Sequence, residues 1–254
     1  MKHLAHILII IFISFSHFSY SQLLRDHEVD ESTIKPWVES DIEKYEDRYI
    51  FQPNDGNYLI IIVDDTCISA QIHYPHHWTE AGFYMETSNI DSSEFRTHSE
   101  YVPLTGVEIK NGKFYSDQYI GEFITFQSDS ILYKGIKVLN SWNLDLWPEY
   151  KYEIGVKRSE KPSEFLKGKY TETSTTILDS TYLSSFSKKE LQIMRNEIYA
   201  RYQYRFKEGS EMSKYFSQQT WYVNRAARYK YVSHMFTWIE LKNIELIKKI
   251  EELK

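Results

Sequence analysis

The sequence predicts an α+β protein, in which an antiparallel all-β domain, a barrel or a sandwich, precedes a small C-terminal helical module. Short apolar and β-branched runs with turn signals between them fill residues 49–157. Apolar residues spaced as on an α-helix are concentrated from Ser187 onward. Because no helical segment separates the short runs, a parallel sheet is not expected.

The first 21 residues have the three-part pattern of a secretory signal peptide. Lys2 supplies the positive charge, residues 7–15 form the apolar run, and Ser19 and Ser21 are the small residues before a cleavage site. The alternative is a membrane anchor, but the run is shorter than the roughly 20 apolar residues that span a bilayer. We expect cleavage, export to the periplasm or the extracellular space, and no transmembrane segment afterwards.

Residues 22–48 are strongly charged and are expected to form a lead-in to the β domain. The runs at 57–63 and 67–73 flank an Asp-Asp turn and predict a β-hairpin. Asn111-Gly112 suits the positive φ angles of a type I′ turn and predicts a second hairpin. The pattern favours a small closed barrel. Further strands are expected at 83–87, 122–126, 131–133, 136–139 and 152–156.

Residues 158–176 are polar and are expected to be a linker before a helical module at 177–254. Ser187 and Glu190 have the spacing of a capping box, which predicts that a helix begins there. Gly209 is the expected stop of this helix. Its apolar stripe comprises Leu191, Met194, Ile198, Tyr202 and Phe206. A last helix is expected at about 236–253, with a stripe of Phe236, Ile239, Asn243, Leu246 and Ile250.

Three blocks in this module resemble the YARHG domain, a small module found mostly at the C-terminal end of exported bacterial proteins. Residues 194–201, Met-Arg-Asn-Glu-Ile-Tyr-Ala-Arg, resemble its signature. Tyr215-Phe216 and Trp221-Tyr222 resemble its middle block, and residues 239–247 resemble its last helix. Tyr202 and Gln203 stand where the family has His and Gly. The resemblance implies a module boundary and export, and it implies no reaction.

Charge is unevenly distributed along the chain, whose overall net charge is −6. Residues 182–254 contain 14 Lys and Arg against 8 Asp and Glu, whereas residues 22–181 contain 15 against 28. Three interpretations follow: the two parts attract each other, the basic module binds an anionic partner, or both are separately solvated surfaces.

Seven residues of the module are candidates for binding. In a structural interpretation, Glu197 and Arg201 form a partly buried pair and Asn196 ties the helix to the following loop. In a functional interpretation, arginines and aromatic residues line a groove, since Arg recognises carboxylates and phosphates. Basic and aromatic residues also interleave as in proteins that bind single strands, but export makes nucleic acid an unsuitable partner. The candidates are Arg195, Asn196, Glu197, Tyr199, Arg201, Trp221 and Tyr222.

Evidence for catalysis is weak in this sequence. His73, His76 and His77 could bind a metal ion, but they lack the spacing of known zinc motifs, and a polar loop after a strand is the simpler interpretation. Asp64-Asp65 is expected to form a turn. Cys67 is the single cysteine, so it excludes a disulfide within the chain. No G-x-S-x-G motif occurs and no cofactor is expected.

The sequence therefore predicts an exported, non-enzymatic protein of the cell envelope. Its basic, aromatic-rich helical module would bind an anionic envelope polymer or an envelope protein. One alternative is a β-barrel carrier of a small apolar ligand. A second alternative is a metal-dependent hydrolase that uses the three histidines.

Overall fold

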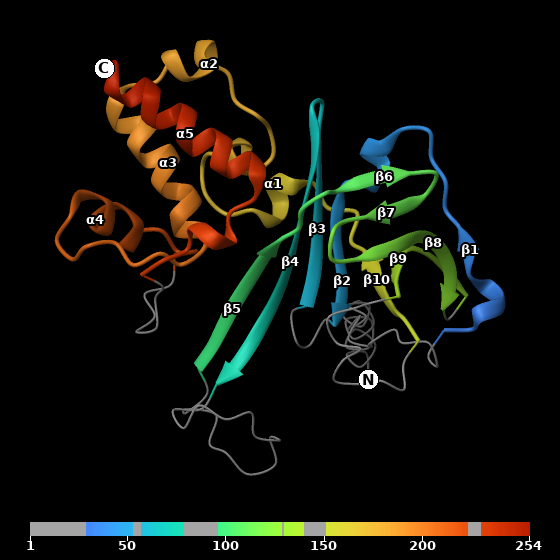
Figure 1. Cartoon of the computed structure of the whole chain (residues 1–254). Coiled ribbons are helices and arrows are strands. Elements are labelled where there is room, and N and C mark those ends of the chain that lie inside the picture. Colours follow the sequence, from blue (N-terminus) through green and yellow to red (C-terminus); the bar gives the residue numbers. More distant parts are fainter. Residues whose placement is uncertain (1–28, 53–56, 79–95, 129, 140–150, 223–229) are drawn as a thin grey trace, which may run out of the picture.

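Alternating apolar residues and tight turns organise the first part of the chain into one antiparallel sheet (Figure 1). The structure, a computed structural model, describes residues 29–52, 57–78, 96–128, 130–139, 151–222 and 230–254. The described strands are β1 (Lys35–Pro36), β2 (Asp47–Gln52), β3 (Asn57–Asp64), β4 (Cys67–Trp78), β5 (Arg96–Pro103), β6 (Glu108–Lys110), β7 (Lys113–Tyr115), β8 (Ile120–Ser128), β9 (Ile131–Val138) and β10 (Glu153–Lys157).

The sheet curls into a half-barrel. Its strands pair in the order β5-β4-β3-β2-β10-β9-β8-β7-β6, and β1 pairs with β8. β5 and β6 end this order, yet they are consecutive in the chain. The connection between them lies against the sheet, because the Leu104 amide donates to the Ala70 carbonyl (2.9 Å) and the Asp117 amide donates to the Thr105 carbonyl (2.8 Å). The α+β prediction is confirmed.

The closed barrel that the sequence favoured is not formed in the described part of the chain. β5 and β6 lie at opposite ends of the strand order and do not pair with each other. β5 instead contacts the short helix η5 (Ser233–Met235), which belongs to the helical module. Contact with the module thus occupies the strand that would have closed the barrel.

Both predicted hairpins are confirmed. β3 pairs with β4, with Ile61 opposite Ala70, and β4 continues through Pro75 beyond the predicted strand end. In the turn between β6 and β7, Asn111 and Gly112 have φ angles of +51° and +72°, as a type I′ turn requires. The two strands expected within 131–139 are one strand, β9. The strand expected at 83–87 lies outside the described residues.

The concave side of the sheet holds the first core. Its buried side chains come from β2, β3, β4, β6, β7, β8 and β9, so the curled strands face one another across it. The lead-in contributes as well, since the Tyr45 ring stacks on Phe123 at 4.1 Å. The buried members are Trp37, Tyr45, Tyr49, Phe51, Leu59, Ile61, Ala70, Ile72, Leu104, Ile109, Phe114, Phe123, Ile136 and Val138.

The convex side of β3, β4 and β5 meets the helices, which lie beside these strands in Figure 1. Ile60 and Ile62 point away from the first core because side chains alternate along a strand. They pack against Ile239 of the last helix. Tyr101 of β5 packs edge-on against Tyr202, with ring centroids 4.9 Å apart. The helical module is therefore joined to the sheet by an apolar contact.

Capping side chains determine where the main helices begin. Ser187 and Glu190 form the predicted capping box of α3, and Thr237 and Glu240 form a second one at α5. Ser210 caps α4. The helices are α1 (Pro162–Phe165), η4 (Thr171–Ser174), α2 (Ser180–Ser184), α3 (Lys188–Arg201), α4 (Glu211–Ser217) and α5 (Trp238–Glu252), and the lead-in contains the short helices η1 (Glu31–Thr33) and η2 (Ile42–Tyr45).

The expected end of the central helix was wrong. α3 stops at Arg201, and Gln203 takes a left-handed conformation with φ +57°. A left-handed residue just past the last turn ends a helix, and Gly usually takes this position because it has no Cβ. Gly209 instead precedes the N-cap of α4. The predicted apolar stripe of α3 is nevertheless buried throughout.

The segment at 158–176 contains α1 and η4. Within it, Tyr170, Thr173 and Ser174 are buried against the other helices. The segment therefore contributes to the packing of the helical part. The division of the chain into domains stays a prediction.

Two glycines let β9 and β10 approach closely at the curl. A Cβ atom on Gly135 would lie 2.6 Å from the Gly155 carbonyl oxygen, and one on Gly155 would lie 2.7 Å from the Phe51 ring. Atoms at such separations overlap, so the backbone would have to shift. Glycine in a strand interior commonly marks such a bend.

We expect Gly135→Ala to lower the free energy of unfolding by about 1–3 kcal/mol, because the added methyl group overpacks this contact. Thermal or urea unfolding of the full chain measures the change. Leu132→Ala, an exposed position on the same strand, is the control and should change stability by less than about 0.5 kcal/mol. Equal stability of the Gly135→Ala variant and the wild type would contradict this account.

Candidate functional site

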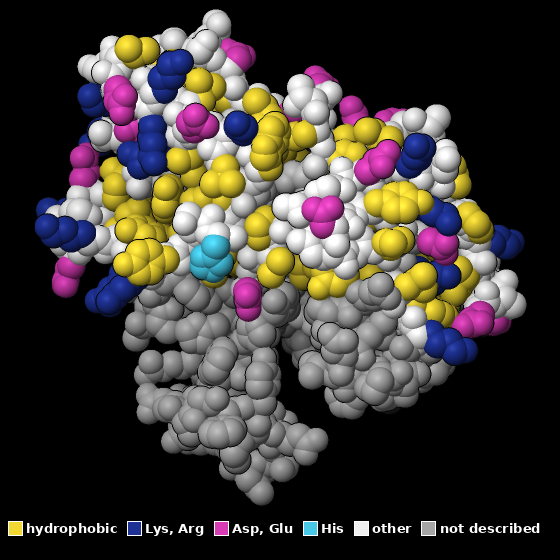
Figure 2. Space-filling view, in the orientation of Figure 1, with side chains coloured by type: hydrophobic (Ala, Val, Ile, Leu, Met, Phe, Trp, Pro, Cys, Tyr) yellow, Lys and Arg dark blue, Asp and Glu magenta, His cyan; other side chains and the backbone are white. Residues whose placement is uncertain are grey.

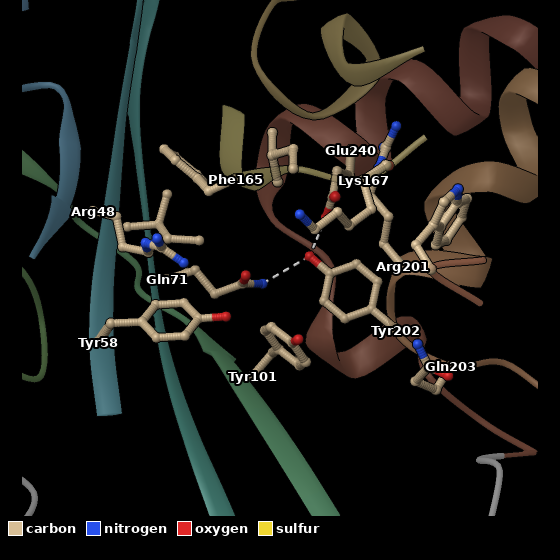
Figure 3. Close-up of a pocket in the computed structure, with 13 residues that line it drawn as sticks. Arg48, Tyr58, Gln71, Tyr101, Phe165, Lys167, Arg201, Tyr202, Gln203 and Glu240 are labelled. Atoms are coloured by element: carbon tan, nitrogen blue, oxygen red, sulfur yellow. Dashed lines mark hydrogen bonds between the residues drawn. The ribbon is translucent and has the colours of Figure 1, made fainter. Parts of the chain in front are cut away.

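A pocket of about 260 Å³ lies where the convex face of the sheet meets the helical module (Figure 3). Arg48, Tyr58 and Gln71 reach into it from the strands, and Tyr202 and Gln203 reach into it from the end of α3. Elements far apart in the sequence thus build one site. Its lining consists of Arg48, Tyr58, Ile60, Gln71, Tyr101, Phe165, Leu166, Lys167, Arg201, Tyr202, Gln203, Trp221 and Glu240.

Arg48 of β2 is held between two aromatic rings on the sheet side. Its guanidinium carbon lies 5.5 Å from the ring centroid of Tyr58 and 5.4 Å from that of Phe165. Its Nη2 donates to Glu160. Its buried Nε has no hydrogen-bond partner among the described residues. A donor of a charged group is therefore positioned at the pocket wall without an acceptor.

A chain of hydrogen bonds joins the sheet to the module at the bottom of the pocket. Gln71 Nε2 donates to Tyr202 Oη (2.9 Å) and to the Met235 carbonyl (2.6 Å). Tyr202 Oη donates in turn to Glu240 Oε2 (2.6 Å), as Figure 3 shows. These side chains are buried. The chain fixes the position of α5 relative to β4.

Glu240 is a carboxylate at the first turn of α5 and is 2% exposed. It accepts from Tyr202 Oη, from Ser174 Oγ and from the Thr237 amide (2.9 Å). Burial raises the pKa of Glu240, and its hydrogen bonds, together with the charge of Arg201, oppose that rise. Three donors therefore compensate an otherwise costly buried acid.

Arg201 closes α3 and uses all five of its N–H groups inside the module. Nε donates to the Lys167 carbonyl (2.7 Å), and Nη2 donates to the Tyr170 carbonyl (2.8 Å) and to Glu197 (2.7 Å). Nη1 donates to the hydroxyls of Thr173 (2.9 Å) and Ser174 (2.8 Å). Since a guanidinium has five donors, Arg201 has none left for a ligand.

Glu197 works with Arg201 as a clamp on the segment before η4. It accepts the backbone amides of Lys169 (2.9 Å) and Tyr170 (2.7 Å). Gly168 makes this approach possible, because a Cβ there would lie 2.2 Å from Glu197 Oε1. The predicted pair of Glu197 and Arg201 is thus present, with side chains only 2% and 7% exposed. The pair holds the segment at residues 167–174 against α3.

Gln203 carries the second polar atom without a partner. Its Oε1 is buried and accepts from no donor among the described residues. Its backbone is in the left-handed region, at a cost of about 1 kcal/mol for a residue with a Cβ. Two residues that line the pocket therefore each carry a buried atom without a partner among the described residues, the donor Arg48 Nε and the acceptor Gln203 Oε1.

The structure brings only two of the seven predicted binding residues to this pocket, Arg201 and Trp221. The other five make contacts within the helical module. Arg195 forms a two-point pair with Glu251 (2.7 and 3.1 Å), which joins α3 to α5. Asn196 donates to the Gln192 carbonyl, Tyr222 donates to the Tyr204 carbonyl, and Tyr199 packs edge-on against Phe236. Glu197 belongs to the clamp already described.

Sequence reasoning missed the sheet side of the pocket. Arg48, Tyr58 and Gln71 are ordinary members of strands, and only the docking of the helices makes their face a pocket wall. One signal was available for Gln71. It lies on a face of β4 that also presents Ser69 and His73, and polar residues on a buried strand face need partners.

The other candidates for chemistry have structural surroundings. His73 is buried, with its ring 4.3 Å from that of Tyr58 and 4.6 Å from that of Tyr101. The side chains of His76 and His77 lie outside the described part. Asp64 accepts from Thr66 in its turn and from the Ile177 amide. Burial raises the pKa of the Cys67 thiol. Among the described residues, no three His, Cys, Asp or Glu side chains gather to hold a metal.

Among the described residues, the ion pairs lie within the acidic part or within the basic part of the chain. Each pair described in residues 29–254 joins partners from the same part, for example Arg48 with Glu160 and Arg195 with Glu251. The contact between the parts combines apolar packing with hydrogen bonds, in which Gln71 donates to Tyr202 and Arg201 donates to Thr173 and Ser174.

Comparison with known proteins identifies the helical part. Residues 168–252 match the family model of the YARHG domain, which confirms the resemblance seen in the signature. YARHG domains are typical of exported proteins. No curated protein and no solved structure matches the chain. Where the structure describes the chain, its helices are too short or too polar to cross a bilayer.

We expect Arg201→Lys to lower the free energy of unfolding by about 2–4 kcal/mol. Lysine has three donors, so at least two buried acceptors would lose their hydrogen bonds. Urea unfolding of the full chain measures the change. Arg205→Lys, at an exposed position in the same region, is the control. A loss below about 0.5 kcal/mol at Arg201 would contradict the clamp.

Glu240 should make stability depend on pH. Because its folded-state pKa lies above the ordinary 4.5, the folded state binds the proton more tightly than the unfolded state. The stability from this group is fully present below pH 4.5 and is lost as pH rises through the folded pKa.

We therefore expect that, as pH rises from about 4.5 to 7, the free energy of unfolding falls less in the Glu240→Gln variant than in the wild type. Urea unfolding at a series of pH values measures the slope of the free energy of unfolding against pH for the variant and for the wild type. Glu245→Gln, at an exposed position on the same helix, should keep the wild-type slope. Parallel slopes for the Glu240→Gln variant and the wild type would show that burial does not raise this pKa.

Proposed function

We propose that this protein is an exported, non-enzymatic binding protein of the cell envelope that holds its ligand in the pocket between sheet and module. The YARHG domain at residues 168–252 supports export. The leader-like pattern of the first 21 residues is consistent with it. The location, periplasmic or extracellular, belongs to the proposal.

The observation that carries the proposal is the pair of unpartnered buried atoms, Arg48 Nε and Gln203 Oε1, on the walls of one pocket. A buried donor or acceptor without a partner costs about 1–3 kcal/mol. The residues that carry these atoms line the pocket from different elements, β2 and the end of α3. A ligand that paired both would recover this cost, and such convergent polar groups are typical of binding sites.

The proposed partner remains an envelope component, either a polymer or a protein. The proposed binding site is the pocket between the sheet and the module, whereas the sequence predicted a basic groove within the module. Arg195, Glu197 and Arg201 are engaged in contacts that stabilise the module. Trp221 is the predicted residue best placed to meet a ligand, because it lines the pocket and is only partly buried. The basic surface would then assist attraction to the envelope and leave recognition to the pocket.

The two alternative functions receive less support. A carrier would need space inside the half-barrel, but large buried side chains such as Tyr49, Phe51 and Phe123 occupy the sheet interior. A hydrolase would need converging histidines, and the His73 ring is held between Tyr58 and Tyr101.

Binding to purified sacculi and to an isolated envelope fraction tests the proposal. The full mature chain should sediment with one of these preparations, and Trp221→Leu should weaken the apparent affinity about tenfold through lost aromatic contact. Trp238→Leu is the matched control, since Trp238 is exposed on α5 and does not line the pocket. Both variants should be checked for unchanged thermal unfolding.

Failure of the wild-type chain to bind either preparation would overturn the proposal. Equal loss of binding in the Trp221→Leu and Trp238→Leu variants would also overturn it, because the site would then lie elsewhere on the module.

A further inference from the structure

We infer that this pocket recognises one neutral sugar ring, either free or at the end of a glycan; the inference rests on the proposed function. Three features of the pocket carry it. They are the hydrogen-bonding requirement of its walls, the neutralisation of its cations and the placement of its aromatic rings.

The walls require a ligand that both donates and accepts. Arg48 Nε offers a proton to an acceptor, and Gln203 Oε1 needs a proton from a donor. A carboxylate or a fully ionised phosphate group only accepts, and an ammonium group only donates. A hydroxyl group does both, so a ligand with several hydroxyls can satisfy both atoms at once. Sugars are such ligands.

The two arginines of the pocket, Arg48 and Arg201, already have carboxylate partners. Arg48 Nη2 lies 2.5 Å from Glu160, and Arg201 Nη2 lies 2.7 Å from Glu197. Glu240 adds a third carboxyl group at the bottom of the pocket. Lys167, the remaining cation of the lining, is exposed, and solvent screens its charge. An anionic ligand would lose its hydration in this pocket and would meet no unpaired arginine that could compensate for the loss.

Aromatic side chains line both sides of the pocket. Arg48 lies over the rings of Tyr58 and Phe165, whereas Tyr101 lines the pocket from the sheet and Trp221 lines it from the helical side. The face of an aromatic ring is electronegative, and the C–H groups of a sugar carry partial positive charge, so the two surfaces attract. A volume of about 260 Å³ is small for a ligand site. It matches a single ring better than an extended chain.

Glucose and glucuronate form a matched ligand pair, because they share the ring and differ only where a carboxylate replaces a hydroxymethyl group. Calorimetric titration of the full mature chain with each, with N-acetylglucosamine and with inorganic phosphate, tests the inference. At least one neutral sugar should bind, more tightly than glucuronate, and phosphate should not compete. An oligosaccharide of the best sugar distinguishes a glycan end from a free sugar as the source.

Two variants connect binding to the named atoms. Gln203→Leu removes the acceptor at similar size, and Arg48→Met removes the donor while keeping an unbranched side chain. Each should weaken sugar binding about tenfold, the effect of one lost hydrogen bond. Arg205→Met, at an exposed position near the end of α3, is the control and should bind as the wild type does. Thermal unfolding of each variant shows whether it folds.

Tighter binding of glucuronate or phosphate than of any neutral sugar would overturn the inference, as would unchanged sugar affinity in folded Gln203→Leu and Arg48→Met. If the chain binds sacculi through Trp221 but binds no sugar, the inference fails and the proposed function stands. If it binds neither, both fail.

Discussion

The arrangement of this protein depends on one buried carboxyl group, that of Glu240. It accepts hydrogen bonds from Tyr202 at the end of α3, from Ser174 in η4 and from the cap of α5. Through Tyr202 it is connected to Gln71 in the sheet. A buried acid is costly unless its lone pairs are matched, so only a docking that brings these donors together is stable. Apolar contact supplies the attraction between sheet and module, and Glu240 selects the orientation.

The signature residues of the YARHG domain serve this arrangement from within the module. Arg195 joins α3 to α5 through Glu251, and Glu197 with Arg201 holds the segment before η4 in place. Such two-point and multi-point pairs are rigid because a guanidinium has planar, fixed donors. The motif therefore identifies the scaffold of the domain. The pocket is lined mostly by positions outside the motif, among them Arg48 and Tyr58 of the sheet and Trp221 of the module.

Gln203 shows how a local departure from a family pattern can acquire a role. Glycine would end α3 without strain, whereas glutamine adopts the same left-handed backbone at some cost. In return, its side chain places an acceptor at the pocket wall. Strained backbone near a binding site is common, because the surrounding structure holds it. Here the rigid end of α3, fixed by Arg201 and Tyr202, provides that support.

The sequence by itself determined the local features of this protein. The Asn111-Gly112 turn, the capping box at Ser187 and the apolar stripe of α3 are confirmed because each depends on residues a few positions apart. Only the tertiary structure decided the half-barrel and the pocket. β5 meets η5 instead of closing onto β6, and Gln71 meets Tyr202 across 131 positions of the chain. Such pairings depend on which apolar surfaces are buried against each other. The periodicity and spacing of residues along the chain do not determine that choice.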